Sequence, residues 1–294
     1  MSLELNEIVK QYGNKTVLKH LNLELEEGKI YGLIGRNGAG KTTMLSIASA
    51  QNPASDGAVL LDGAGVWENQ AALNEIFFSR EFGMGIAANG TANTIKVKEH
   101  FKMARLLLPY WDQEMADRLV KEFEIDTKQH IYKLSKGMQS MVTIITALAS
   151  KAKYTFLDEP VAGLDVVARK RFYRLLLEEY TESGRTFVIS THIIEEASDL
   201  FEEVIFLDKG EILLKENTEE LLARGIYVSG RADDVDAAIE GKKGYQPETL
   251  GRSKGVTLLL NPGETFDKEG RDLDVRPVNL QDLFAALCGG EESV

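Results

Sequence analysis

Residues 35–43 have the types and the spacing of a loop that binds phosphate. They fit the pattern G-x-x-x-x-G-K-[ST], in which glycines let backbone N–H groups surround a polyphosphate and the lysine reaches its terminal phosphates. The threonine hydroxyl would bind magnesium, and the N-terminus of a following helix would add partial positive charge. A glycine-rich turn that binds nothing is disfavoured, because an apolar run precedes the loop and a helix-like segment follows it. The predicted phosphate-binding residues are Gly35, Asn37, Gly38, Ala39, Gly40, Lys41, Thr42 and Thr43.

A second group of candidate residues follows two apolar runs further along the chain. Asp158 and Glu159 end the run at 154–157, where one carboxylate can hold magnesium and its neighbour can polarise water. His192 follows the run at 185–190 in the same register. Because ligands bind where the carboxyl ends of parallel strands meet, Glu159 and His192 are expected to lie on one edge of a parallel sheet. A lone histidine after a strand is usually structural, so its function depends on that shared edge.

Two further features have a structural and a functional interpretation, and the residues alone leave both open. Ser135 precedes an apolar helix predicted over 141–149, where its first role is that of an N-cap. The same hydroxyl, together with the backbone of Gly137, could form an anion site at the helix N-terminus. Tyr12 stands beside a turn, where its ring either packs or stacks on an adenine ring.

The elements that must position these residues alternate between short strands and helices. Helices are predicted from residue 44, over 95–125 with a break at 109–112, over 141–149, and up to about 180, with Asp112 as the N-cap after the break. The small, uncharged residues 83–91 are typical of a mobile loop. Strands are predicted at 3–9, 21–25, 30–34, 58–62, 76–78, 154–158 and 185–190.

The last part of the chain has a different pattern. A hairpin with strands at 203–207 and 211–214 leads into a helix with Thr218 as its expected cap. From Gly225 onward the predicted order is strand, helix, polar link, strand at 256–260, acidic loop, strand and helix. We interpret this part as a small α+β appendage without a convincing catalytic set.

Composition and charge disfavour several classes of function. The chain has 294 residues and a formal net charge of −12, which argues against nucleic acid as a main partner. Its single cysteine, Cys288, excludes an internal disulfide and a cysteine zinc cluster, and fits a reducing compartment. The acidic N-terminus lacks the apolar region of a signal peptide. No apolar run approaches the roughly 18 residues of a transmembrane helix, so any membrane role is expected to depend on a partner.

Taken in their order along the chain, these motifs resemble those of the ATP-binding subunit of an ABC transporter, and the resemblance covers about residues 3–222. The resemblance implies an α/β fold, namely a P-loop NTPase ATPase domain with a RecA-like core, an antiparallel β subdomain and a helical subdomain at about 86–150. Residues 1–222 would form this domain and residues 223–294 a small C-terminal α+β accessory domain. The resemblance also implies ATP and Mg²⁺ as cofactors, and pairing of two such subunits head to tail around ATP.

The resemblance assigns a role to each motif. Tyr12 takes the adenine-stacking position, residues 35–42 form the Walker A loop, and Asp165 belongs to the D-loop. The signature motif, which contacts the ATP bound by the other subunit, contains Ser135, Gly137 and Gln139. The implied catalytic residues are Glu159 as general base, His192 as switch histidine, and Lys41. The implied magnesium ligands are Thr42 and Asp158.

Three positions depart from the family pattern. Lys136 replaces a glycine of the signature, and a branch of bacterial exporters similarly has L-S-K-G-M there. Arg80 stands where the family has a glutamine that touches magnesium and the attacking water, so the departure concerns metal coordination and coupling. Val161 and Ala162 replace small polar residues before the D-loop.

The same branch implies a biological setting. Residues 109–112, 134–138 and 278–284 are similar to Gram-positive type-2 exporter ATPases, which work with separately encoded membrane subunits. Exporters of toxin peptides such as phenol-soluble modulins are the functional analogy. A homodimer on the cytoplasmic face of the cell membrane is then expected, held there by the membrane subunit. Two alternatives stay open: a nucleotide-gated assembly module with little hydrolysis, and a soluble ABC ATPase outside transport.

Overall fold

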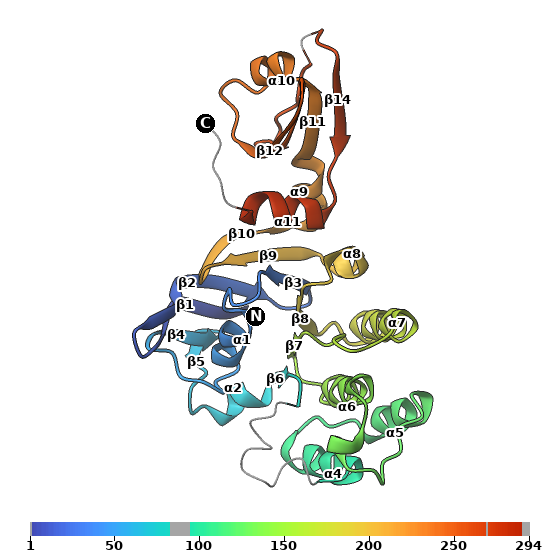
Figure 1. The fold of residues 1–294 in the computed structure, drawn as a ribbon. Helices are drawn as coiled ribbons and strands as arrows, with labels where there is room; N and C mark the ends of the chain where they lie inside the picture. The colour runs from blue at the N-terminus through green and yellow to red at the C-terminus, as the bar shows by residue number, and fades with distance from the viewer. Residues whose placement is uncertain (1, 83–94, 269, 290–294) are drawn as a thin grey trace. The chain divides into compact units, whose positions relative to one another are not determined.

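The computed structural model describes residues 2–82, 95–268 and 270–289. The chain divides into two units, one formed by Met1–His192 with Ile205–Leu214 and the other by Ile193–Val204 with Lys215–Val294. Figure 1 shows the elements of both units. The domain boundary expected between residues 222 and 223 stays a prediction, and the loop expected at 83–91 lies outside the described residues.

A six-stranded sheet in the order β10-β9-β3-β8-β7-β6 carries the candidate catalytic residues. Strands β3, β8, β7 and β6 pair in parallel. β3 and β8 are buried along their whole length, so neither shows the alternation of a half-exposed strand, although β8 includes the polar residues Thr186, Ser190 and Thr191. The strand bounds are β3 Ile30–Gly35, β6 Ile76–Ser79, β7 Tyr154–Asp158, β8 Thr186–Thr191, β9 Glu203–Asp208 and β10 Glu211–Asn217.

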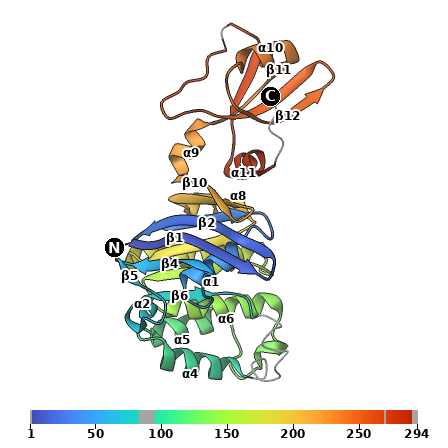
Figure 2. The same cartoon turned by 90° about the vertical axis from the view of Figure 1, so that its left-hand side faces the viewer.

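An antiparallel sheet in the order β2-β1-β4-β5 shares a hydrophobic core with the six-stranded sheet (Figure 2). Helix α1, Lys41–Ala48, contributes Met44 and Leu45 to this core, together with Leu5 of β1 and Phe156 of β7. The helix that follows the phosphate-binding loop is thereby anchored to both sheets. The strand bounds are β1 Ser2–Tyr12, β2 Lys15–Glu26, β4 Asp56–Leu61 and β5 Ala64–Gly65.

Helices α4, α5, α6 and α7 agree with the predicted pattern, although α6 begins at Lys136 rather than at residue 141, and α2 and the turn η2 were not predicted. In Figure 1, α6 and α7 lie on the opposite side of β7 and β8 from α1. The expected cap after the helix break is confirmed, because the Asp112 carboxylate accepts a hydrogen bond from the Met115 backbone N–H at 2.9 Å. The bounds are α2 Gln70–Asn74, α4 Val97–Leu107, α5 Gln113–Glu122, the 3₁₀ turn η2 Ile131–Lys133, α6 Lys136–Ala149 and α7 Val166–Ser183.

The second unit contains a four-stranded antiparallel sheet in the order β12-β13-β11-β14. One face of this sheet forms a small core, in which Val228, Val256 and Leu258 pack with Val235 of α10. The bounds are α8 Ile194–Ala197, the 3₁₀ turn η3 Ser198–Leu200, α9 Thr218–Arg224, β11 Gly225–Arg231, α10 Ala232–Ala238, β12 Gly244–Leu250, β13 Ser253–Leu259, β14 Leu273–Pro277 and α11 Leu280–Cys288.

Two expectations for this unit are wrong. The segment expected as a polar link contains β12, an edge strand. The cap of α9 is Asn217 rather than Thr218, because the Asn217 side chain accepts a hydrogen bond from the Glu220 backbone N–H at 3.1 Å. Thr218 is instead buried as the first helical residue. Within the described ranges, no helix has the length and apolar character needed to cross a membrane.

Candidate active site

The phosphate-binding loop connects β3 to α1 through backbone conformations that require glycine. Gly38 has a φ of 83° and Gly40 a φ of 112°. A Cβ atom on Gly40 would lie 2.7 Å from Leu18 Cδ2, and one on Gly35 would lie 2.5 Å from the carbonyl oxygen of Leu207. The loop therefore begins at Gly35 and meets helix α1 at Gly40, two positions with no room for a side chain. The sequence prediction of a strand, loop and helix is confirmed.

Lys41 holds its ammonium group at the floor of this loop. The residue is only 7% exposed, and its Nζ donates a hydrogen bond to the Gly35 carbonyl at 2.6 Å. The same Nζ lies 3.8 Å from Glu159 Oε1. A lysine held in this way has donors left for an anionic oxygen above the loop.

A pocket of about 310 Å³ opens over the loop. Its lining combines three basic side chains with two acidic ones from β7 and the residue after it. This mixture suits a polyphosphate together with a divalent cation, because the phosphate charge meets both ammonium groups and a carboxylate-bound metal. The charged lining residues are Lys15, Arg36, Lys41, Asp158 and Glu159.

Asp158 lies at the end of β7 and is fixed by two hydroxyl groups. Thr42 Oγ1 donates a hydrogen bond to Asp158 Oδ2 at 2.6 Å, and Ser190 Oγ donates one to Asp158 Oδ1. The predicted metal-binding pair, Thr42 and Asp158, is thus brought together from α1 and β7. A hydroxyl and a carboxylate are the oxygen donors that Mg²⁺ takes, so this pair fits the ion.

Glu159 and His192 lie on one sheet edge, as the sequence predicted. His192 Nδ1 lies 2.7 Å from Glu159 Oε2, although His192 is mostly exposed and Glu159 is not. The backbone N–H of Glu159 donates to the Ser190 carbonyl oxygen at 3.0 Å, which ties the end of β7 to β8. A carboxylate oriented by a histidine beside a phosphate site can act on a water molecule as a general base.

Tyr12 occupies the end of β1, where its hydroxyl accepts a hydrogen bond from Asn52 Nδ2 at 2.5 Å. The Nζ atom of Lys10 lies 4.9 Å from the centre of its ring. The nearby wall of the phosphate pocket is formed by Lys15 and Val17. The ring is half exposed, so it could still present a face to a base.

Ser135 and Gly137 line a different pocket from the phosphate-binding loop, whereas Lys136 between them lines a pocket with Asn37 of that loop. Ser135, Gly137 and Asp165 line a second pocket of about 520 Å³. Ser135 is confirmed as the N-cap of α6, since its Oγ accepts a hydrogen bond from the Met138 N–H at 3.2 Å. Gln139 Nε2 donates to the Leu134 carbonyl oxygen at 3.1 Å. Ser135, Gly137 and Asp165 therefore line a pocket distinct from the one over residues 35–43.

Asp165 also has a structural role. It is the N-cap of α7, because its Oδ1 atom accepts a hydrogen bond from the Ala168 backbone N–H at 2.8 Å. The turn before it packs tightly on α6, where a Cβ atom on Gly137 would lie 2.8 Å from the Gly163 carbonyl oxygen. The signature and the D-loop segment therefore form one packed surface within the chain.

Sequence reasoning missed two groups at the site. Ser190 supports Asp158, and the signal was available, because Asp158 and Ser190 are register partners in the parallel pair of β7 and β8. Lys136 Nζ lies 3.2 Å from Glu81 Oε1, and Arg80 lines the same pocket of about 390 Å³ as this pair. This contact joins distant parts of the sequence, so no local pattern indicates it.

Comparison with known proteins gives one consistent family. Residues 18–162 match the family model described as ABC transporter. The chain is 31% identical over 212 residues to the taurine import ATP-binding protein TauB of Escherichia coli, across 71% of this chain and 80% of TauB. It is 27% identical to the ABC transporter ATP-binding protein YtrB of Bacillus subtilis, across 98% of this chain and 99% of YtrB. It is 28% identical to the lantibiotic transport ATP-binding protein SrtF of Streptococcus pyogenes, across 78% of this chain and 99% of SrtF.

Solved structures agree on the fold. An ATP-binding subunit of an ABC transporter superposes with a TM-score of 0.65 at 22% identity, over 76% of this chain and 92% of that one. A dimeric, post-hydrolysis structure of the ATP-binding cassette MJ0796, bound to ADP and Pi, gives a TM-score of 0.62 at 24% identity, over 74% of this chain and 98% of that one. The expected P-loop NTPase fold is thereby confirmed.

Proposed function

Because the chain belongs to the family of ABC transporter ATP-binding proteins and is an ATPase of that family, we propose that it uses the pocket over residues 35–43 to power a separate membrane subunit. One observation carries this proposal. Lys41, Thr42, Asp158 and Glu159, from two regions of the chain, line a single pocket, and His192 lies against Glu159. These are the groups that nucleotide hydrolysis needs.

The phosphate loop binds and orients the substrate. Its backbone N–H groups and the Lys41 ammonium would hold the β- and γ-phosphates of ATP, since the ammonium lies buried with donors directed out of the loop. Thr42 and Asp158 would hold Mg²⁺, which when bound offsets phosphate charge. Ser190 keeps the Asp158 carboxylate in place for that ion.

Glu159 is the proposed general base. Its backbone is fixed to β8 and its carboxylate is held by His192, so it can orient a water molecule or accept its proton. His192 is the proposed contact to the γ-phosphate. Lys41 Nζ lies 3.8 Å from Glu159 Oε1, so the two side chains form an ion pair beside the pocket.

A second subunit completes each ATP site in this proposal. Ser135, Gly137 and Asp165 line a pocket other than the one over their own phosphate loop, so they, together with Gln139, would face the ATP bound by a partner copy. Each copy carries a net charge of −12, so a triphosphate with its cation must bridge basic and polar groups at the contact. Tyr12 would stack on the adenine ring of this shared nucleotide.

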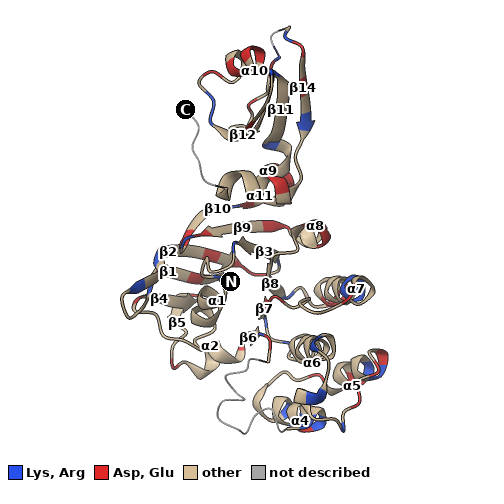
Figure 3. Ribbon diagram, in the orientation of Figure 1, with Lys and Arg blue, Asp and Glu red and all other residues tan. Residues whose placement is uncertain are grey.

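Export, with peptides as one possible cargo class, is the proposed direction of transport. The support is the similarity over 99% of SrtF, a protein named for lantibiotic transport, together with Lys136 in the signature. The similarity to TauB, a protein named for taurine import, favours the opposite direction of transport. In either case the chain would sit at the cytoplasmic face of a membrane through its partner. Along α5, Lys and Arg are interspersed with Asp and Glu (Figure 3). Together with the net charge of −12, this supports a partner other than nucleic acid.

The variant Glu159→Gln tests the catalytic assignment. It keeps the side-chain size but removes the base, so ATP binding should persist while phosphate release slows by about 10²–10⁴-fold. Glu178→Gln, which alters an exposed carboxylate on α7, is the matched control and should hydrolyse ATP normally. Near-normal turnover by Glu159→Gln would remove Glu159 from the role. A wild-type chain that binds ATP but releases no phosphate would favour the nucleotide-gated assembly module instead.

A further inference from the structure

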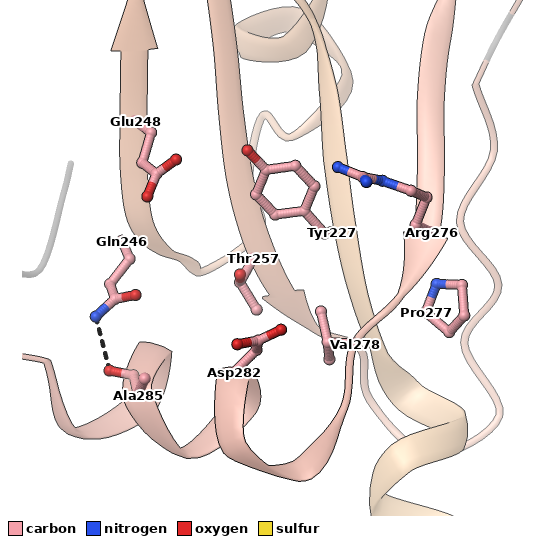
Figure 4. A pocket seen from close by; sticks show the side chains of 9 residues that line it. All are labelled: Tyr227, Gln246, Glu248, Thr257, Arg276, Pro277, Val278, Asp282 and Ala285. Carbon is pink, nitrogen blue, oxygen red and sulfur yellow. Dashed lines mark hydrogen bonds between the residues drawn. The ribbon is translucent and has the colours of Figure 1, made fainter. Parts of the chain in front are cut away.

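A pocket in the second unit lies outside everything assigned so far. It has a volume of about 290 Å³ and lies on the sheet face opposite the small core around Val228 (Figure 4). Its lining comes from β11, β12, β13 and β14 and from α11. All of these elements belong to one unit, so the pocket is complete within it.

Strand alternation builds the floor of the pocket. Val228 and Val256 face the core, and their neighbours Tyr227 and Thr257 therefore face the pocket. Tyr227 pairs in register with Thr257 on one side and with Arg276 on the other. Three polar side chains thus form one row across three strands.

Glycines let the larger side chains lie across this floor. A Cβ atom on Gly255 would lie 1.9 Å from the Tyr227 hydroxyl oxygen, so the ring occupies the space that a side chain there would fill. Gln246 adopts a φ of 46° at an irregularity of β12, and its Nε2 donates to the Ala285 carbonyl oxygen at 2.8 Å. This bond ties β12 to α11 across the end of the pocket (Figure 4).

The charge of the lining is unbalanced. Arg276 is its one basic side chain, and its Nε lies 3.1 Å from Asp274 Oδ2 while its guanidinium stacks 5.2 Å from the centre of the Tyr227 ring. Glu248 and Asp282, by contrast, make no side-chain hydrogen bond or ion pair with the described residues. Two carboxylates therefore face the pocket without forming an ion pair, and the one cation of the lining, Arg276, is paired with Asp274.

Thr257 gives an independent sign that the pocket is a binding site. It is only 7% exposed, and its hydroxyl points into the pocket without a hydrogen-bond partner among the residues that the structure describes (Figure 4). The hydroxyl of the half-buried Tyr227 likewise has no such bond. Both hydroxyl oxygens are therefore open to the pocket, where a ligand atom would gain a hydrogen-bond partner.

We propose that this pocket binds a small organic cation, a primary ammonium group on a short carbon chain. The ammonium has three donors and no acceptor. The carboxylates of Glu248 and Asp282 and the hydroxyl oxygen of Thr257 would accept its hydrogen bonds. The carbon chain would lie on the Tyr227 ring. The volume admits a ligand at the small end of the usual range, which begins at about 300 Å³. The site is independent of ATP.

Calorimetric titration of the full chain with 1,4-diaminobutane tests this proposal. Saturable binding tighter than about 1 mM is expected, while glutarate, a dianion of similar length, should not bind. Nα-acetyl-lysinamide, titrated in parallel, separates the two sources of such a cation: tighter binding of the free diamine indicates a metabolite, and tighter binding of the lysine derivative indicates a side chain of a partner. Failure of both amines to bind, or equal binding of glutarate, would overturn the proposal.

Variants locate the binding in this pocket. Glu248→Gln, Asp282→Asn and Thr257→Val should each weaken binding, the first two by about tenfold or more, because hydrogen bonds to charged groups are the strong ones. Glu240→Gln and Thr249→Val make the same chemical changes at exposed positions of the same unit and should bind as the wild type does. Unfolding midpoints and circular dichroism establish that each variant is folded. Unchanged affinity in the three pocket variants would refute the site.

Discussion

Replacing Glu179 with alanine should destabilise the first unit far more than replacing its neighbour Glu178 with alanine. Glu179 on α7 is 2% exposed, and both of its carboxylate oxygens accept hydrogen bonds from Lys151 Nζ, at 2.7 and 2.9 Å. Arg185, also buried, places its Nε 3.1 Å from Glu179 Oε1. One carboxylate thus neutralises two cations next to β7, the strand that carries Asp158.

The magnitude follows from what the substitution leaves behind. Burial lowers the pKa of Arg185 to about 10, while the charge of Glu179 acts in the opposite direction. The guanidinium therefore stays charged at neutral pH. Glu179→Ala leaves it buried without a carboxylate partner, with hydrogen bonds to the Leu148 and Ala152 carbonyl groups and a contact with the Phe187 ring. Breaking a buried pair in this way costs about 3–5 kcal/mol.

Urea unfolding measures the difference, with Glu178→Ala as the control. Glu178 forms an exposed pair with Arg174 at 3.6 Å, and such surface pairs contribute under about 1 kcal/mol. The unfolding midpoint should fall strongly for Glu179→Ala and hardly at all for Glu178→Ala. Equal midpoints for the two variants would show that the buried network adds no net stability, and would refute the reasoning.

Three further predictions concern the phosphate loop, a buried histidine and a helix cap. Gly40→Ala should lose ATP affinity by about tenfold or more in a binding titration, because it forces φ 112° on alanine and a Cβ atom 2.7 Å from Leu18. Burial lowers the pKa of His100 from 6.5 to about 4, so the unfolded chain binds a proton that the folded chain excludes. Stability should therefore fall as the pH drops from about 6.5 towards 4, by up to about 3 kcal/mol, and His100→Gln should flatten this part of the unfolding profile. Asn217→Ala should destabilise the chain by about 1 kcal/mol through the lost cap. Thr218→Val should instead raise its thermal stability, because the buried Thr218 hydroxyl has no hydrogen-bond partner among the described residues.

The sequence predicted the parts of the site that lie at strand ends. Buried parallel strands are read as apolar runs, and the residue after each run is then fixed at one sheet edge. Asp158, Glu159 and His192 were located in this way, and their contacts follow from the pairing of β7 with β8. The loop at 35–43 was equally visible, since its glycines are needed at fixed spacing.

Features that depend on exposed strands or on distant contacts were not predictable. Strand β12 is an edge strand with an exposed face and with Pro247 in its middle, so it lacks both the apolar run and the alternation that indicate a strand. Asn217 and Thr218 are both good cap residues, and only the hydrogen bond to the helix separates them. The pair of Lys136 and Glu81 joins residues more than fifty positions apart.

The backbone of Glu159 connects the fold to the proposed chemistry. Its φ of 49° lies in the left-handed region, which costs an ordinary residue about 1 kcal/mol or more. Asp62 and Lys209 share this conformation and also follow strands, but each is followed by glycine in a tight turn, whereas Glu159 is followed by Pro160. A glycine would relieve the strain but would supply no carboxylate for His192 and Lys41 to hold. Strain of this kind persists where surrounding bonds impose it, here those from Ser190, and it gathers at functional sites. We therefore take the strained glutamate as support for the general base.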